Sequence, residues 1–352
     1  MCSVMYVVFV LIAILITLPI TSPGYYKKGN LPGALLCLAL AVCAWLLGRQ
    51  FPIVGGPIIA ILLGLLVANI WPYPEKLKPG ISATSKRVLQ MAIVLLGFQM
   101  NLNSVLTLGG QGLLLIAATI ATALLLAYGV GKALRMQSHE QILIGAGSAI
   151  CGASAIAATA PVIKADERTV ITAISTIFLF NIVAVFVYPF AGHLLDMSDL
   201  RFGLWCGAAI NDTSSVVAAA YSYSDEAGYA ATVVKLTRTL MIIPITLILA
   251  VIQTKKSGKD SGFSLRKIFP WFVAAFFAAS VITSIGFIPA ETTAFWGTMG
   301  KFCITMALAA IGLNTNAREL IKHGKKPVLL GGICALAIAL VSLLVQELSG
   351  II

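Results

Sequence analysis

Charged side chains are scarce in this sequence. Asp, Glu, Lys and Arg make up 11% of its 352 residues, whereas they make up about 25% of a typical soluble domain. Apolar residues account for 59% of the chain. Such a composition excludes an ordinary soluble protein, because most of its surface could not face water. It predicts an all-α polytopic membrane protein, since helices satisfy their own backbone hydrogen bonds in lipid.

Common catalytic motifs are also missing. The sequence contains no HExxH, no GxSxG and no P-loop, and its three histidines, His139, His193 and His323, fall at the edges of apolar segments. Its seven cysteines show no CxxC spacing. These absences argue against ATP as the energy source, a disulfide framework and a zinc site. We therefore expect no cofactor, no bound metal and no enzymatic activity.

Apolar runs of about 20 residues follow one another along the chain. They predict about 10 to 12 membrane segments, which lie at residues 4–20, 31–48, 53–71, 88–106, 112–131, 141–163, 170–192, 200–222, 227–252, 269–288, 293–313 and 327–349. The first run lacks a basic n-region and an A-x-A site, so we interpret it as a retained helix and not a cleaved signal peptide.

The net charge of +11 comes mainly from cations in short loops. They cluster at residues 76–87, 132–135, 255–267 and 318–326, as the positive-inside rule describes. A topology signal explains this pattern better than a nucleic-acid surface. It predicts a multi-pass protein of the cell inner (cytoplasmic) membrane, with lipid and no nucleic acid among its partners. The loops near 107–111 and 289–293 then fall outside.

Two stretches that end apolar segments resemble each other. MAIVLLGFQMN (residues 91–101) pairs with MALAAIGLNTN (residues 306–316), and a Phe-Pro pair precedes both at nearly the same offset, at 51–52 and 269–270. A three-helix block therefore occurs twice. With the topology set by charge, the two copies run in opposite directions, as in the inverted repeats of secondary transporters.

A second repeat aligns GSAICGASAIAATA with GAAINDTSSVVAAA. The predicted organisation is an N-terminal helix (1–30), a first repeat half (31–195) with its motif at 147–161, and a second half (196–352) with its motif at 207–220. Coincidence between two small-residue helices is the alternative explanation.

The two motif segments allow two arrangements. If both cross the membrane as broken helices, the loop KADER (residues 164–168) with its two cations falls outside. If each is a re-entrant hairpin, KADER becomes cytoplasmic and SDE (residues 224–226) stays outside. Charge favours two opposed re-entrant hairpins, and two crossing broken helices remain the alternative.

The first motif consists almost entirely of small residues. Around Ser148, Cys151, Gly152 and Ser154, backbone N–H groups could approach a bound solute, and a half-helix beginning there would present its positive dipole end to an anion. Close helix packing through small residues is the alternative.

The second motif places polar residues in a row within an apolar segment: Asn211, Asp212, Thr213, Ser214 and Ser215. A carboxylate inside a membrane is costly and is by default a functional candidate. Asp212 could carry a proton, bind a cation or pair with a basic residue.

Two cations follow on the next helix. Lys235 and Arg238 are three residues apart and share one face, at a depth from which snorkelling is difficult. They could neutralise a bound anion. The alternative is a structural salt bridge from Asp212 to one of them.

The stretches GSAICGASAIAATAPVIKA, AAINDTSSVVAAA and VVKLTRTLMIIP resemble the YeiH-type family of bacterial inner-membrane proteins, whose members are called sulfate exporters. The resemblance covers the chain from about residue 31 onward. It implies a relation to the group of cation/proton antiporters and anion transporters, in which inverted repeats and elevator motions occur. It also implies a homodimer, and it assigns no binding residues.

The main hypothesis is a secondary active transporter of a small anion, such as sulfate or an organosulfonate, bound where the two motifs meet at mid-membrane. Asp212 would couple transport to H⁺ or Na⁺. The predicted substrate-binding residues are Ser148, Cys151, Gly152, Ser154, Asn211, Thr213, Ser214, Ser215, Lys235 and Arg238. An anion channel is one alternative, which saturable counterflow would exclude. Another is a membrane-embedded enzyme subunit with Asp212 and Lys235 as acid and base.

Overall fold

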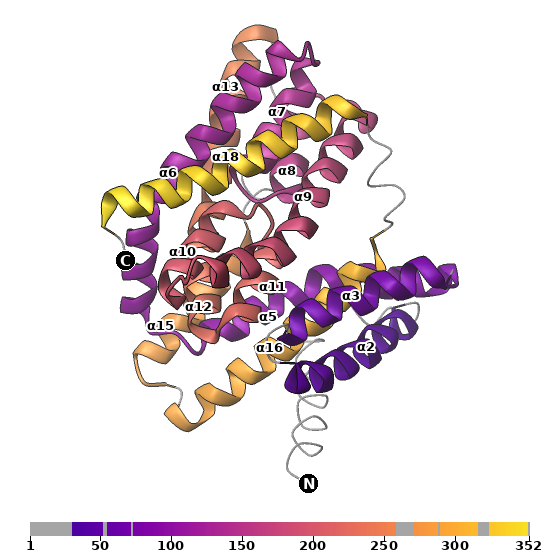
Figure 1. Ribbon diagram of the computed structural model, residues 1–352, viewed down its shortest axis with the longest axis vertical. Coiled ribbons are helices and arrows are strands. Elements are labelled where there is room, and N and C mark those ends of the chain that lie inside the picture. The colour runs from indigo at the N-terminus through magenta and orange to yellow at the C-terminus, as the bar shows by residue number, and fades with distance from the viewer. Residues whose placement is uncertain are drawn as a thin grey trace. The chain divides into compact units, whose positions relative to one another are not determined.

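The computed structural model describes residues 30–51, 55–71, 73–257, 270–287, 289–315 and 324–350. The regular elements within these ranges are all helical (Figure 1), which confirms the predicted all-α class. Six described helical stretches are long and apolar enough to cross a membrane: Leu31–Gln50, Leu102–Ala133, Glu167–Leu194, Asp225–Leu249, Thr292–Leu313 and Lys325–Ser349. The helix predicted at 4–20 lies outside the described residues.

The chain forms two compact units. The first takes its described residues from 1–102 and 272–317, and the second takes them from 103–271 and 318–352. Each unit thus combines residues from both predicted repeat halves. The division into halves itself stays a prediction.

Small residues hold the first unit together. Its helices are α2 (Leu31–Gln50), α3 (Gly55–Ile70), the 3₁₀ turn η1 (Glu75–Leu77), α4 (Lys78–Ala83), the π turn η2 (Thr84–Val88), α5 (Leu89–Gly97), α15 (Trp271–Ser284) and α16 (Ala290–Leu313). A Cβ built on Gly64 of α3 would lie 2.9 Å from the Cα of Gly312 in α16, and one built on Gly97 of α5 would lie 3.0 Å from the Cβ of Ala279 in α15. The backbones at both places are close together, as in other small-residue membrane contacts.

The second unit begins with a helix longer than the sequence predicts. α6 (Leu102–Ala133) runs through residues 107–111, so the prediction of an outer loop there is wrong. Gly109 and Gly112 do not end the helix but make room for a neighbour: a Cβ on Gly112 would lie 2.9 Å from a methyl group of Val234. The predicted loop at 289–293 is likewise wrong in its extent, because α16 begins at Ala290.

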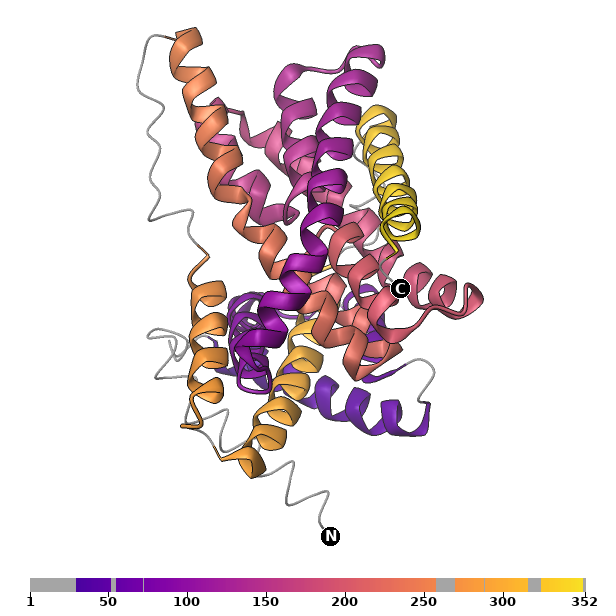
Figure 2. The ribbon, with the colours of Figure 1, turned by 90° about the vertical axis from the view of Figure 1, so that its left-hand side faces the viewer.

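The predicted segment 227–252 is two helices, α12 (Asp225–Leu240) and α13 (Ile242–Ser257). Pro244, which has no N–H to donate, lies in the first turn of α13 and accounts for the interruption. α13 packs against α8 (Ala153–Ile163), and Figure 2 shows it in orange at one side of this unit.

The first motif forms a helical hairpin, here called the first hairpin. α7 (Ser138–Ala149) and α8 are separated by residues 150–152. Residues 135–137 before α7 and residues 166–169 after α8 line the same cavity of about 1100 Å³. A straight crossing helix would put these ends about 35 Å apart at 1.5 Å per residue, so α8 must return to the side from which α7 enters.

The second motif forms the second hairpin, α10 (Asp199–Ala209) and α11 (Thr213–Tyr223). The end of α11 lies beside the start of α10, because Tyr223 stacks on Phe202 with 3.9 Å between ring centroids and donates a hydrogen bond to the carbonyl of Met197. Of the two arrangements predicted for the motifs, the structure has the hairpins.

The two hairpins start from opposite ends of α9 (Glu167–Leu194). The first residues of α9 line the cavity at the base of the first hairpin. Near its other end, a Cβ on Gly192 would lie 2.4 Å from the ring of Phe202 in the second hairpin. Within this unit, Figure 1 accordingly shows α7 and α8 toward the top and α10, α11 and α12 toward the bottom.

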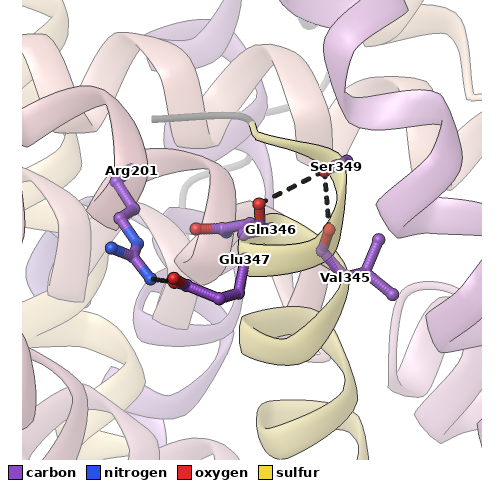
Figure 3. A network of polar contacts seen from close by, with 5 residues as sticks. All are labelled: Arg201, Val345, Gln346, Glu347 and Ser349. Carbon is purple, nitrogen blue, oxygen red and sulfur yellow. Dashed lines mark hydrogen bonds and ion pairs between the residues drawn. The ribbon is translucent and has the colours of Figure 1, made fainter.

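α10 and α12 approach each other backbone to backbone. A Cβ on Gly203 would lie 2.7 Å from the carbonyl oxygen of Ala227, and one on Gly207 would lie 2.7 Å from that of Ala231. The last helix, α18 (Lys325–Ser349), contacts the first turn of α10 through an ion pair of 2.6 Å from Arg201 to Glu347 (Figure 3).

Candidate functional site

The breaks of the two hairpins meet. Gly152 in the first break has φ 63° and ψ −126°, a backbone conformation that only glycine adopts readily. A Cβ at this position would lie 3.5 Å from the Cβ of Asp212 in the second break and 3.6 Å from the amide nitrogen of Asn181 on α9. Residues about 60 positions apart in the sequence therefore face one another.

Lys235 of α12 lies between the breaks and is 0% exposed. Its Nζ donates hydrogen bonds of 2.9 Å to the carbonyl oxygens of Ile150 and Ile210. Each of these residues directly follows the first helix of a hairpin, where carbonyls have lost their helical partners. A single ammonium group therefore joins the two interrupted helices.

Arg238, one turn further along α12, is also 0% exposed. It donates to Ala149 (2.8 Å) and Ser148 at the end of α7, and to Ala208 (2.7 Å) and Ile210 (3.3 Å) at the end of α10, all at carbonyl oxygens. Cations at helix C-termini are stabilised by the helix dipole. Both cations are thus held by main-chain oxygens.

Asp212 caps α11. Its carboxylate accepts hydrogen bonds from the backbone amides of Ser214 (3.0 Å) and Ser215 (3.4 Å) and from the Ser214 hydroxyl. Within the described residues, no ion pair joins Asp212 to Lys235 or Arg238. The alternative of a structural salt bridge from Asp212 is therefore wrong, because the carboxylate caps the N-terminus of α11.

The two half-helices that leave the breaks differ at their N-termini. α11 has a carboxylate cap, whereas no side chain caps α8. Ala153 and Ser154 in the first turn of α8 are exposed, while Thr213, Ser214 and Ser215 of α11 are buried. The N-terminus of α8 is therefore the accessible positive helix end at this site.

Two buried polar atoms at the breaks have no hydrogen-bond partner. They are the hydroxyl of Ser148, which is 0% exposed, and the side-chain oxygen of Asn211, which is 2% exposed. Buried polar groups are nearly always satisfied in native proteins. Both atoms lie where a bound solute or water could supply the missing partner.

The structure places all the predicted site residues at the two breaks or on α12 beside them. It brings Gly152 and Asp212 together, and it puts both cations against both hairpins. The Ser154 side chain is exposed, whereas the Ser214 hydroxyl is used by Asp212. Asn181 is not among the site residues that the sequence predicted. An asparagine within a 28-residue apolar helix was the signal for its place at the breaks.

A different kind of polar site lies in the cavity at the base of the first hairpin. Its lining includes cations and carboxylates together: Arg135, Glu140, Asp166, Glu167, Arg168, Lys325 and Lys326. Hydrogen bonds from Thr169 hold the pKa of Asp166 below its usual value, and partial burial raises the pKa of Glu140. The mixture of signs gives this cavity no strong preference for one charge.

Known proteins similar to this chain are membrane proteins. A family model described as "Conserved hypothetical protein 698" matches residues 32–331. A UPF0324 membrane protein of Streptococcus pyogenes serotype M6 is 52% identical over 92% of this chain and 98% of its own length. Similar proteins from Fusobacterium nucleatum (45%) and Streptococcus mutans (47%) each align over 92% of this chain and 99% of their own length.

Proposed function

The chain belongs to the YeiH-type family of UPF0324 membrane proteins, and we propose that it is a secondary active transporter of a small anion. The observation that carries the proposal is the pair of fully buried cations at the meeting point of two hairpins. Burying a charge is costly unless it is compensated. Among the residues that the structure describes, Asp212 is the one carboxylate that neighbours this pair of cations.

The accessible end of α8 supplies the rest of the anion site. Its first-turn amides carry the positive end of the helix dipole and have no capping side chain. The unpartnered Ser148 hydroxyl, in the last turn of α7 on the other side of the break, adds a donor. Small oxyanions such as sulfate or an organosulfonate fit this chemistry, because they accept several N–H and O–H hydrogen bonds at once.

The arrangement of small residues supports an inverted repeat. The aligned repeats in the sequence relate α3 to α15 and α5 to α16, and the contact of Gly64 with Gly312 then corresponds to that of Ala279 with Gly97. The two hairpins start from opposite ends of α9, as expected for oppositely oriented copies of the second sequence repeat. Transporters commonly bind substrate at discontinuous helices related in this way.

The whole site lies in the second compact unit. This supports an elevator-type carrier, which moves its site as one body. The proposed location is the bacterial inner membrane, the energy source is a gradient of H⁺ or Na⁺, and the functional form is a homodimer. A closed pair of hairpin tips favours a carrier over a channel. The Asp212 carboxylate caps α11, which disfavours an enzyme that would use Asp212 and Lys235 as an acid–base pair.

Flux in proteoliposomes tests the proposal. We expect purified protein to move labelled sulfate or methanesulfonate across the vesicle membrane, with saturation and with acceleration by unlabelled anion on the far side. A channel would show no such counterflow. If neither anion moves, with or without a pH or Na⁺ gradient, the proposed function is wrong.

Replacing Ser154 with aspartate should block the site. A carboxylate in the first turn would occupy the N-terminus of α8 and repel an anion, while helix stability would rise slightly. We expect flux to fall at least about tenfold, equivalent to about 1.4 kcal/mol. Ser154→Asn is the matched control, because it has the same size without the charge and should stay within about threefold of wild type. Equal flux in the two variants would contradict an anion site at α8.

A further inference from the structure

Lys235 uses only part of its hydrogen-bonding capacity. An ammonium group has three N–H donors, and Nζ makes two hydrogen bonds, both of 2.9 Å and both to carbonyl oxygens. A neutral amine has two N–H donors and a lone pair. Lys235 can therefore lose one proton and still hold the ends of both interrupted helices.

Arg238 does not share this property. It makes four hydrogen bonds through three nitrogen atoms, and a guanidinium group stays protonated in proteins. The Arg238 side chain therefore keeps its positive charge in every state of the site. Of the two buried cations, only Lys235 can change its charge without losing its structural contacts.

Few other titratable groups in the described part of the chain face Lys235. They are Arg238 on its own helix, Cys151 in the first break and Asp212 in the second, while Tyr188 of α9 faces Arg238. Asp212 is poorly suited to carry the proton, because its ionised form accepts three hydrogen bonds at the start of α11. Protonation would weaken that cap.

The charges balance in two states of the site. With Lys235 neutral and no anion bound, Arg238 and Asp212 cancel. With Lys235 protonated, a bound anion of charge −1 restores a net charge of zero. A dianion would leave one negative charge uncompensated in a buried place, which is costly.

Resting on the proposed function, we propose that Lys235 is the proton carrier and that one proton moves together with one monovalent oxyanion. Water on the side to which the site opens gives a proton to the Nζ lone pair as the anion binds. After the site has moved, Nζ returns the proton to water on the other side and the anion leaves. Transport is then electroneutral symport, and a sulfonate is a better substrate than sulfate.

Proton uptake on binding tests this assignment. Methanesulfonate is added to weakly buffered purified protein, and the proton uptake and the affinity are measured by titration calorimetry in two buffers of different ionisation enthalpy. We expect about one proton per anion in wild type, and a Kd that rises about tenfold per pH unit once the empty protein has lost its Lys235 proton.

Lys235→Arg fixes the charge. This variant should bind methanesulfonate with no proton uptake and a pH-independent Kd, and should show counterflow without accumulation driven by a pH gradient. Lys132→Arg, at the end of α6 near Tyr128, is the matched control and should behave as wild type. One proton taken up by Lys235→Arg would overturn the assignment.

The wild-type protein provides a second test if Lys235→Arg does not fold. Methanesulfonate transport in proteoliposomes on a solid-supported membrane should produce no net current. A current carried by methanesulfonate, or binding without proton uptake, overturns the inference while anion transport still stands. Absence of any anion binding overturns both.

Discussion

Replacing Arg238 with methionine should abolish transport and lower the stability of the protein. The guanidinium group satisfies four carbonyl oxygens at the ends of α7 and α10, and each hydrogen bond from a charged donor contributes about 1.5 to 3 kcal/mol. Methionine fills similar space without donors. We expect anion flux to fall at least about a hundredfold, equivalent to about 2.7 kcal/mol, and the midpoint of thermal unfolding in detergent to drop.

Arg201→Met is the matched control for this change. Arg201 also sits in the second unit, but its side chain is 31% exposed and pairs with the exposed Glu347 (Figure 3). Surface ion pairs of this kind contribute about 0 to 1 kcal/mol. The control should therefore keep nearly wild-type flux and unfolding midpoint. A stable, active Arg238→Met protein would show that α7 and α10 do not depend on this bridge.

Substituting alanine for Gly152 should impair transport while leaving the fold intact. At φ 63° and ψ −126°, a residue with a Cβ is strained by about 1 to 3 kcal/mol. The Cβ itself would not clash, because its nearest neighbour is 3.5 Å away. The strain would be relieved by rotation of the first break, which moves the N-terminus of α8. We expect flux to fall at least about tenfold, measured with the same liposome assay.

Gly129→Ala is the matched control for Gly152→Ala, because it also replaces a glycine but introduces no backbone strain. Gly129 lies in α6, and a Cβ there meets nothing within 4 Å. Alanine should raise helix stability by up to about 1 kcal/mol with no loss of flux. Wild-type flux in Gly152→Ala would mean that the conformation of the break is not needed for transport.

The helices, the two breaks and the hairpins could be predicted from the sequence, because each depends on residues that are close together in the chain. Apolar runs gave the helices, and the small-residue motifs and the row of polar residues gave both breaks. The charges of KADER and SDE favoured hairpins, which the structure has. The family suggested by the motifs is confirmed by relatives of 45–52% identity.

What the sequence could not show is where the hydrogen bonds of the cations go. Lys235 and Arg238 were expected to face an anion, but their partners are main-chain oxygens 25 to 90 residues away. Every residue has a main-chain carbonyl oxygen, so the residue types do not show which of these oxygens a distant cation contacts. The prediction of a loop at 107–111 was wrong because it also depended on a distant contact. Glycines often end helices, but Gly109 and Gly112 lie within α6 and make room for α12.

The backbone contact between α10 and α12 gives the site one stiff side. Gly203 and Gly207 contribute no side chain to this contact, so the main chain of α10, which leads to Ile210, packs directly against α12. The opposite contact, from Lys235 to Ile150, reaches a helix pair with an exposed, uncapped turn. We therefore expect movement within the site to occur mainly in the first hairpin, while the second hairpin keeps its position against α12.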